Sequence, residues 1–192
     1  MKNKWLVLTL FCFIFSMVKA QDSNYFLPTT TFGFKAGTHL GTVKTVLNDE
    51  SDSNSRNGFY IGGFLAFNRS EKVSILTEVV YSSTEFELND RLGLLHIPVF
   101  VKYNVTDFLG VYAGPESQFL LSISNTDTRS SIYKKFILAV DTGIQLKVSP
   151  KLLIDARYSL GVSKFIDFSY NDYKKLNAIQ LGIVYSFDYS DL

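Results

Sequence analysis

The chain has 192 residues, enough for one domain and a processed segment, and its 19 Lys and Arg residues nearly balance its 18 Asp and Glu residues. This balance offers no basic field to a nucleic acid, so we expect no nucleic-acid partner. Beyond the N-terminal segment, no apolar run reaches the roughly 20 residues that a membrane helix requires.

The N-terminus predicts a secretory signal peptide over residues 1–20. Lys2 and Lys4 form its positive region, and an apolar stretch follows that is short for a transmembrane anchor. We expect cleavage near Ala20. Cys12, the only cysteine, lies inside this peptide, so the mature chain would have none. A mature chain without cysteine fits a bacterial envelope protein better than a secreted eukaryotic domain.

A periplasmic leader (21–29), a barrel domain (30–187) and a C-terminal tail (188–192) are expected to follow. The barrel region divides into eight segments rich in aromatic and β-branched residues, and no window has a convincing helical repeat. We predict strands at 30–43, 57–68, 72–87, 93–104, 108–123, 134–148, 152–165 and 175–187.

The connections between these strands alternate in length. Tight turns are expected at 68–72, 104–107 and 149–151, and long polar stretches at 44–57, 84–92, 124–133 and 166–174. Short turns at one rim and long loops at the other are typical of an outer-membrane barrel. The predicted fold class is therefore all-β: an eight-stranded antiparallel up-and-down transmembrane β-barrel with short periplasmic turns and long extracellular loops.

One face of each predicted strand is nearly free of charge. In 93–104, for example, Leu95, Ile97 and Val99 alternate with His96 and Pro98. Small residues suit the crowded interior of a narrow barrel, and nine of the 12 glycines fall on the polar face: Gly33, Gly37, Gly41, Gly62, Gly110, Gly114, Gly143, Gly161 and Gly182.

The apolar face ends in aromatic residues, among them Tyr103, Tyr185 and Phe187. Such residues suit the girdle of a membrane barrel at the lipid interface. We therefore expect the apolar face to contact lipid and the polar face to line the lumen. The alternative is a soluble periplasmic lipocalin-like barrel, in which the apolar face points inward and binds an apolar ligand.

Charged residues on the polar face predict an ionic network in the lumen. A Lys or Arg turned toward lipid at the midplane would cost roughly 2–4 kcal/mol, whereas inside the barrel mutual pairing offsets desolvation. We expect Asp141 opposite Arg157, and Glu116 near His96. The predicted structural network consists of Lys35, Glu78, His96, Lys102, Glu116, Asp141 and Arg157. We also expect a bulge or local irregularity at Pro98 and at Pro115, which cannot donate to the ladder.

Several motifs in their order resemble the PorT-like outer-membrane β-barrel family of Bacteroidetes-type Gram-negative bacteria. They are LGLLHIPVFVKYNV, GVYAGPESQFLL, LAVDTGIQLKVS, LLIDARYSLGVS and AIQLGIVYSF. The resemblance covers about 30–187 and implies a small outer-membrane barrel. The namesake of the family assists a system that exports proteins across the outer membrane. That role is not transferred here, because no motif identifies the contacts it requires.

Three classes of function remain open. The first is a structural or interaction barrel, for which the 44–57 stretch with Asp49, Glu50, Asp52 and Arg56 is the expected contact surface. The second is an enzyme, which we do not expect, because the only histidines, His39 and His96, are assigned to the lumen. The third is a narrow porin-like channel, which side chains filling an eight-stranded interior would block.

The expected partners follow from this location in the cell outer membrane. They are outer-membrane lipid, the outer-membrane insertion machinery and a protein contacted through the loops, outside the cell or in the envelope. We expect a monomer without cofactor, metal or catalytic residues. The acidic stretch NDESDSN lacks the spaced acidic frame and distal glutamate of a calcium loop.

Overall fold

A computed structural model describes residues 29–47, 50–85, 91–123, 134–167 and 173–188. The predicted signal peptide, and the loop predicted at 124–133, lie outside the described residues. No helix among the described residues is long and apolar enough to span a membrane. The strands are β1 (Thr29–Leu47), β2 (Glu50–Asn68), β3 (Val73–Glu85), β4 (Arg91–Asn104), β5 (Leu109–Ile123), β6 (Phe136–Lys147), β7 (Leu152–Gly161), β8 (Ile166–Asp167) and β9 (Tyr173–Asp188).

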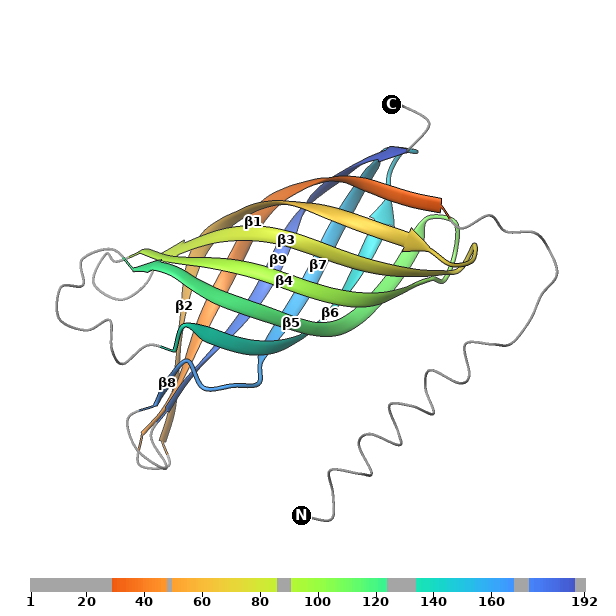
Figure 1. The fold of residues 1–192 in the computed structure, drawn as a ribbon. Helices are drawn as coiled ribbons and strands as arrows, with labels where there is room; N and C mark the ends of the chain where they lie inside the picture. The colour runs from red at the N-terminus through yellow and green to blue at the C-terminus, as the bar shows by residue number, and fades with distance from the viewer. Residues whose placement is uncertain (1–28, 48–49, 86–90, 124–133, 168–172, 189–192) are drawn as a thin grey trace, which may run out of the picture.

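The sheet closes on itself as a barrel (Figure 1). Neighbours follow the order β1-β2-β3-β4-β5-β6-β7-β9, every pairing is antiparallel, and β9 pairs in turn with β1. Lys35 of β1, for example, lies opposite Gly62 of β2 on one side and Val184 of β9 on the other. The two-residue strand β8 pairs only with the first two residues of β9. The predicted eight-stranded antiparallel barrel is therefore confirmed.

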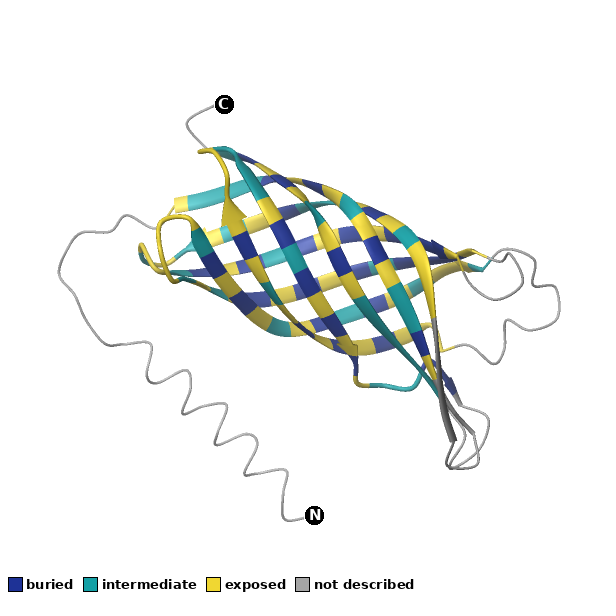
Figure 2. Cartoon of the chain, turned by 180° about the vertical axis from the view of Figure 1, so that it is seen from behind, coloured by how far each residue is buried: buried dark blue, intermediate teal, exposed yellow. Residues whose placement is uncertain are grey.

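Buried and exposed residues alternate along most of each strand (Figure 2). Because successive strand residues point to opposite sides, one set of side chains fills the interior and the other covers the outside. The outside set is apolar: Val101 is 63% exposed and Ile183 is 55% exposed. Lys35 and Glu78, by contrast, are buried. The lipocalin-like alternative is wrong, because the apolar face points outward.

Tight turns join the strands at one rim of the barrel. Val105 N donates to Leu109 O at 2.9 Å, and Val148 N donates to Leu152 O at the same distance. Thr29 and Asp188 lie at this rim, since β1 begins there and β9 ends there (Figure 1). The last strand includes Asp188, so the C-terminal tail predicted at 188–192 begins one residue later.

The prediction of a long loop over 44–57 is wrong. β1 and β2 remain paired through Leu47 and Glu50, far beyond Gly58, where the pairing of β2 with β3 ends. β9 follows β1 as far as Val46, and β8 pairs with the start of β9. We call this extension the projecting sheet; it runs past the other strands at the lower left of Figure 1.

The two prolines do not shift the register. Pairing of β4 with β5 keeps one register from Pro98↔Glu116 to Val101↔Ala113, although no bridge forms between these pairs. Pro115 lies within a continuous ladder with β6. The register shift in the β4–β5 ladder lies elsewhere, between Gly93 and Leu94, so neither proline forms a bulge. The predicted local irregularity is present instead as interrupted ladders: Pro115 has no partner in β4, and Pro98 has none in β3.

Candidate functional site

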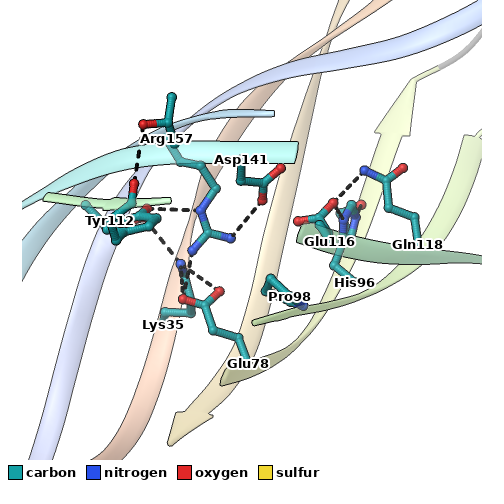
Figure 3. Close-up of polar contacts among 12 residues, drawn as sticks. Lys35, Glu78, His96, Pro98, Tyr112, Glu116, Gln118, Asp141 and Arg157 are labelled. Atoms are coloured by element: carbon teal, nitrogen blue, oxygen red, sulfur yellow. Dashed lines mark hydrogen bonds and ion pairs between the residues drawn. The ribbon is translucent and has the colours of Figure 1, made fainter. Parts of the chain in front are cut away.

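The centre of the lumen holds a buried ionic cluster around Glu78. Lys35 Nζ lies 3.1 Å from each carboxylate oxygen of Glu78, and Arg157 Nη2 donates to Glu78 Oε1 at 2.7 Å (Figure 3). The three residues come from β1, β3 and β7, and each is at most 3% exposed. Their mutual pairing offsets the cost of removing three charges from water.

Asp155 is a further acid of this cluster that the sequence analysis left out. Lys35 Nζ lies 3.3 Å from its Oδ2, and the Tyr112 hydroxyl donates to its Oδ1 at 2.9 Å. The same hydroxyl accepts a 3.0 Å hydrogen bond from Arg157 Nε. Asp155 stands on the polar face of its strand, two residues before Arg157, and that alternation was the signal that could have identified it.

Aromatic rings surround the two buried cations. The Arg157 guanidinium lies 4.6 Å from the centroid of the Phe100 ring, and Lys35 Nζ lies 5.5 Å from that of Tyr60. Gly37 and Gly182 face each other across β1 and β9, where a Cβ on either would collide with the Tyr60 hydroxyl. These two glycines therefore create the space that the Tyr60 ring occupies.

A second polar cluster contains His96. Its Nδ1 lies 2.8 Å from Glu116 Oε1, and its Nε2 lies 2.7 Å from Ser82 Oγ. Gln118 Nε2 donates to Glu116 Oε1 at 2.5 Å, and His39 hydrogen-bonds Thr84 nearby. Figure 3 shows His96, Glu116 and Gln118 beside the ionic cluster.

Ser82, His96 and Glu116 follow the order of a hydrolase relay, but the described residues leave little space beside them. Ser82 is 1% exposed, and the adjoining cavity has a volume of about 40 Å³. Such a volume holds roughly three water molecules, whereas ligand pockets measure roughly 300–1,000 Å³. Among the described residues, this cluster is therefore a set of buried, mutually hydrogen-bonded polar groups beside a small cavity.

Asp141 lies between the two clusters, but in a different register from the one predicted. It pairs with Ser159, and Arg157 pairs with Gly143. Diagonal approach still brings Arg157 Nη1 within 3.8 Å of Asp141 Oδ2. The predicted position of Asp141 directly opposite Arg157 is therefore wrong by two residues, although their side chains are close.

Lys102 does not contact any acid of the predicted ionic network. Its Nζ donates to the amide oxygen of Gln145 at 2.8 Å, and Gln145 Nε2 donates to Asp155 Oδ1 at 3.0 Å. Lys102 thus reaches the ionic cluster only through a neutral amide. It lines a wide cavity at the short-turn rim. The structure therefore places five of the seven predicted residues in the two polar clusters and Asp141 between them, and it leaves Lys102 outside.

Apolar layers close the lumen on both sides of the polar clusters. Toward the long-loop rim the layer contains Val43, Leu92, Leu94, Ile137, Phe165 and Ile166. Toward the short-turn rim it contains Phe64, Leu76, Phe100, Tyr112 and Val184. Each of these side chains is at most 8% exposed. The middle of the described interior is thus a packed core, as expected for eight strands, and a cavity lies beyond it at the short-turn rim.

Among the residues that the structure describes, no group of three His, Cys, Asp or Glu side chains is arranged to hold a metal ion. The buried histidines instead contact Glu116, Ser82 and Thr84.

Comparison with known proteins agrees with this architecture. Residues 20–167, well over half of the chain, match the family model described as outer membrane protein beta-barrel domain. No curated protein matches the sequence. Ail, the attachment invasion locus protein of Yersinia pestis, is similar in fold, with a TM-score of 0.54 and 19% identity over 84% of this chain and 100% of that one.

Two further solved structures have lower scores. Neisserial surface protein A has a TM-score of 0.47 and 15% identity over 83% of this chain and 99% of its own. OprG from Pseudomonas aeruginosa has a TM-score of 0.45 and 11% identity over 84% of this chain and 97% of its own. With a closed barrel, an apolar exterior and a family match over most of its length, this chain belongs to the outer membrane protein β-barrel family.

Proposed function

We propose that the protein is a non-conducting, non-enzymatic barrel that anchors an interaction surface in the outer membrane. The absence of conduction is supported by the filled middle of the lumen. Apolar layers lie there on both sides of the buried pairs between Glu78, Lys35 and Arg157. In planar lipid bilayers we expect no discrete conductance steps. Reproducible steps would favour the narrow porin-like channel instead.

The projecting sheet supports the proposed interaction surface. Residues 50–57 of β2 pair with β1 on one side, and the described residues provide no β3 partner on the other. An unpaired strand edge presents a row of N–H and C=O groups that can pair with another extended chain. A protein partner adding a strand to this edge is the interaction that we propose.

Site-specific photo-crosslinking in intact cells tests this surface. A photoreactive residue at the exposed Asn57 should give a discrete cross-linked product, and one at the exposed Thr106 of a short turn should not. Replacing residues 45–52 by Asn-Gly, a two-residue hairpin turn, should abolish the product and leave the barrel folded. No product at Asn57, or an unchanged product in the shortened variant, would contradict the interaction role.

The apolar exterior supports outer-membrane lipid and the insertion machinery as partners of a monomeric barrel. We further propose that the chain reaches the outer membrane after cleavage near Ala20. Intact-mass analysis of the protein from that membrane would detect a mature chain beginning at Gln21. The motif order supports a PorT-like member of the family, and deletion followed by analysis of secreted proteins would test a role in export.

A further inference from the structure

A cavity of about 620 Å³ occupies the short-turn end of the barrel. Residues 105–108 of a short turn line it. We call it the periplasmic vestibule, because the short turns of outer-membrane barrels face the periplasm. Its volume lies within the range of roughly 300–1,000 Å³ that small-molecule pockets occupy. The cavity at the other end of the polar clusters has about 40 Å³. Among the described residues, the interior is therefore nearly filled toward the long-loop rim and hollow toward the short-turn rim.

Lys102 brings a positive charge into this vestibule, and no acid among the described residues pairs with it. Its side chain is partly buried, and its Nζ donates to Gln145 Oε1 at 2.8 Å. No carboxylate of the described residues lies within ion-pair distance of it. An ammonium has three donors, so two remain for whatever occupies the cavity. A partly desolvated charge is costly when it is unpaired.

Gln145 is held in one orientation, so it offers Lys102 a neutral amide oxygen and no negative charge. Its Nε2 donates to Asp155 Oδ1 at 3.0 Å, so its amide oxygen must face Lys102. Asp155 itself is committed to Lys35 and Tyr112. The acid nearest to Lys102 along this chain of hydrogen bonds is therefore already neutralised by the central cluster.

The vestibule has three lysines against two acids, and its wall is partly polar, with Asn68 and Ser74, and partly apolar. Lys72 and Lys147 line it together with Lys102, against Glu71 and Asp107. Leu76, Leu153 and Val184 also line it. An occupant that complements both features carries a negative group and an apolar body.

We propose that the periplasmic vestibule binds a small organic anion from the periplasm, a carboxylate with an apolar body, whose carboxylate contacts Lys102. A Lys ammonium acts as a point charge for such a group. The apolar body would displace water from the walls that Leu76 and Leu153 provide. Because the lumen beyond is filled, the vestibule is a terminal binding site and not the entrance of a pore.

Nuclear magnetic resonance of the ¹⁵N-labelled full barrel in phosphatidylcholine nanodiscs tests the proposal, with benzoate as the probe. Benzoate should cause saturable shifts of the Gly110 amide, since Gly110 lines the vestibule and packs against Lys102. Benzyl alcohol, neutral and of similar shape, and inorganic phosphate, charged but without an apolar body, should each bind at least 10-fold more weakly.

Lys102→Gln should weaken benzoate binding at least 10-fold, and Lys102→Arg should retain it. Leu153→Glu, which adds a carboxylate to the wall from another strand, should also weaken it and guards against a folding defect peculiar to Lys102 variants. Arg69→Gln, at the same rim but outside the vestibule, is the matched control and should bind as the wild type does. Absence of saturation, or binding that Lys102→Gln leaves unchanged, would overturn the proposal. Equal binding of phosphate or of benzyl alcohol would do the same.

Discussion

Arg157 donates a 2.7 Å hydrogen bond from Nη2 to Oε1 of Glu78 across the barrel lumen. Arg157 lies on β7 and Glu78 on β3, which are four strands apart in either direction around the closed order of eight. The two residues therefore join opposite walls of the barrel. Lys35, two strands from each wall, contacts Glu78 from the side.

Glu78→Gln should lower the free energy of unfolding by about 3 kcal/mol, because it leaves two buried cations facing a neutral amide. The loss should lie at the low end of the range for broken buried pairs, since Asp155 still contacts Lys35. Urea unfolding in lipid vesicles, followed by circular dichroism, measures this change. The matched control Glu71→Gln, exposed in a short turn, should stay within about 0.5 kcal/mol of the wild type. Equal effects of both substitutions would show that the cross-lumen pair is not a stabilising contact.

Gly182→Ala should destabilise the barrel by about 1–3 kcal/mol, as overpacked cores do. Its new methyl group would collide with the Tyr60 hydroxyl and with the backbone oxygen of Ala36. Tyr60→Phe should restore part of the loss by removing the hydroxyl. Gly63→Ala serves as the control, because the nearest atom to its Cβ would lie 3.5 Å away. Urea unfolding in lipid vesicles measures the stability of these variants. A Gly182→Ala variant as stable as Gly63→Ala would refute the packing argument.

Ile183→Lys should cost about 2–4 kcal/mol, the value for a cation on the lipid face near the membrane centre. Ile183 is 55% exposed and lies opposite Ala36, the residue after Lys35 of the central ionic cluster. Val105→Lys has similar exposure, 51%, but lies in a short turn outside the lipid region and should be nearly neutral. Similar costs at the two positions would mean that the exterior does not contact lipid.

The strands and their two faces could be predicted from the sequence because a period of two specifies both at once. Val99 and Val101 alternate with Phe100 and Lys102, and their exposure alternates in the structure. Lipid excludes charge from one face, so Lys35 and Arg157 could be assigned to the lumen before any partner was known. Fold class therefore follows from local pattern and solvent alone.

Partners across the lumen could not be predicted in the same way. Even pairs on adjacent strands depend on where the turn between them is centred. When the centre of the β6–β7 turn moves by one residue, the partner of Asp141 moves by two, from Arg157 to Ser159. Cross-lumen contacts such as Lys35 with Asp155 depend on how the closed sheet staggers, which no single hairpin specifies.

The projecting sheet was missed because its sequence has the composition of a loop. The stretch NDESDSNSRN is polar on both faces, so it lacks the alternation that identifies a half-buried strand. Its pairing of β1 with β2 continues through Thr45↔Asp52 nevertheless. Backbone pairing that extends an existing hairpin requires no buried face, and composition alone does not reveal it.

Heat-modifiability of the mature protein extracted from the outer-membrane fraction tests the central claim most directly. A closed lipid-facing barrel should stay folded in cold detergent, migrate faster on a gel than its boiled form, and fractionate with the outer membrane. A soluble periplasmic protein whose migration does not change on boiling would contradict the account, because its apolar face would then have to be buried.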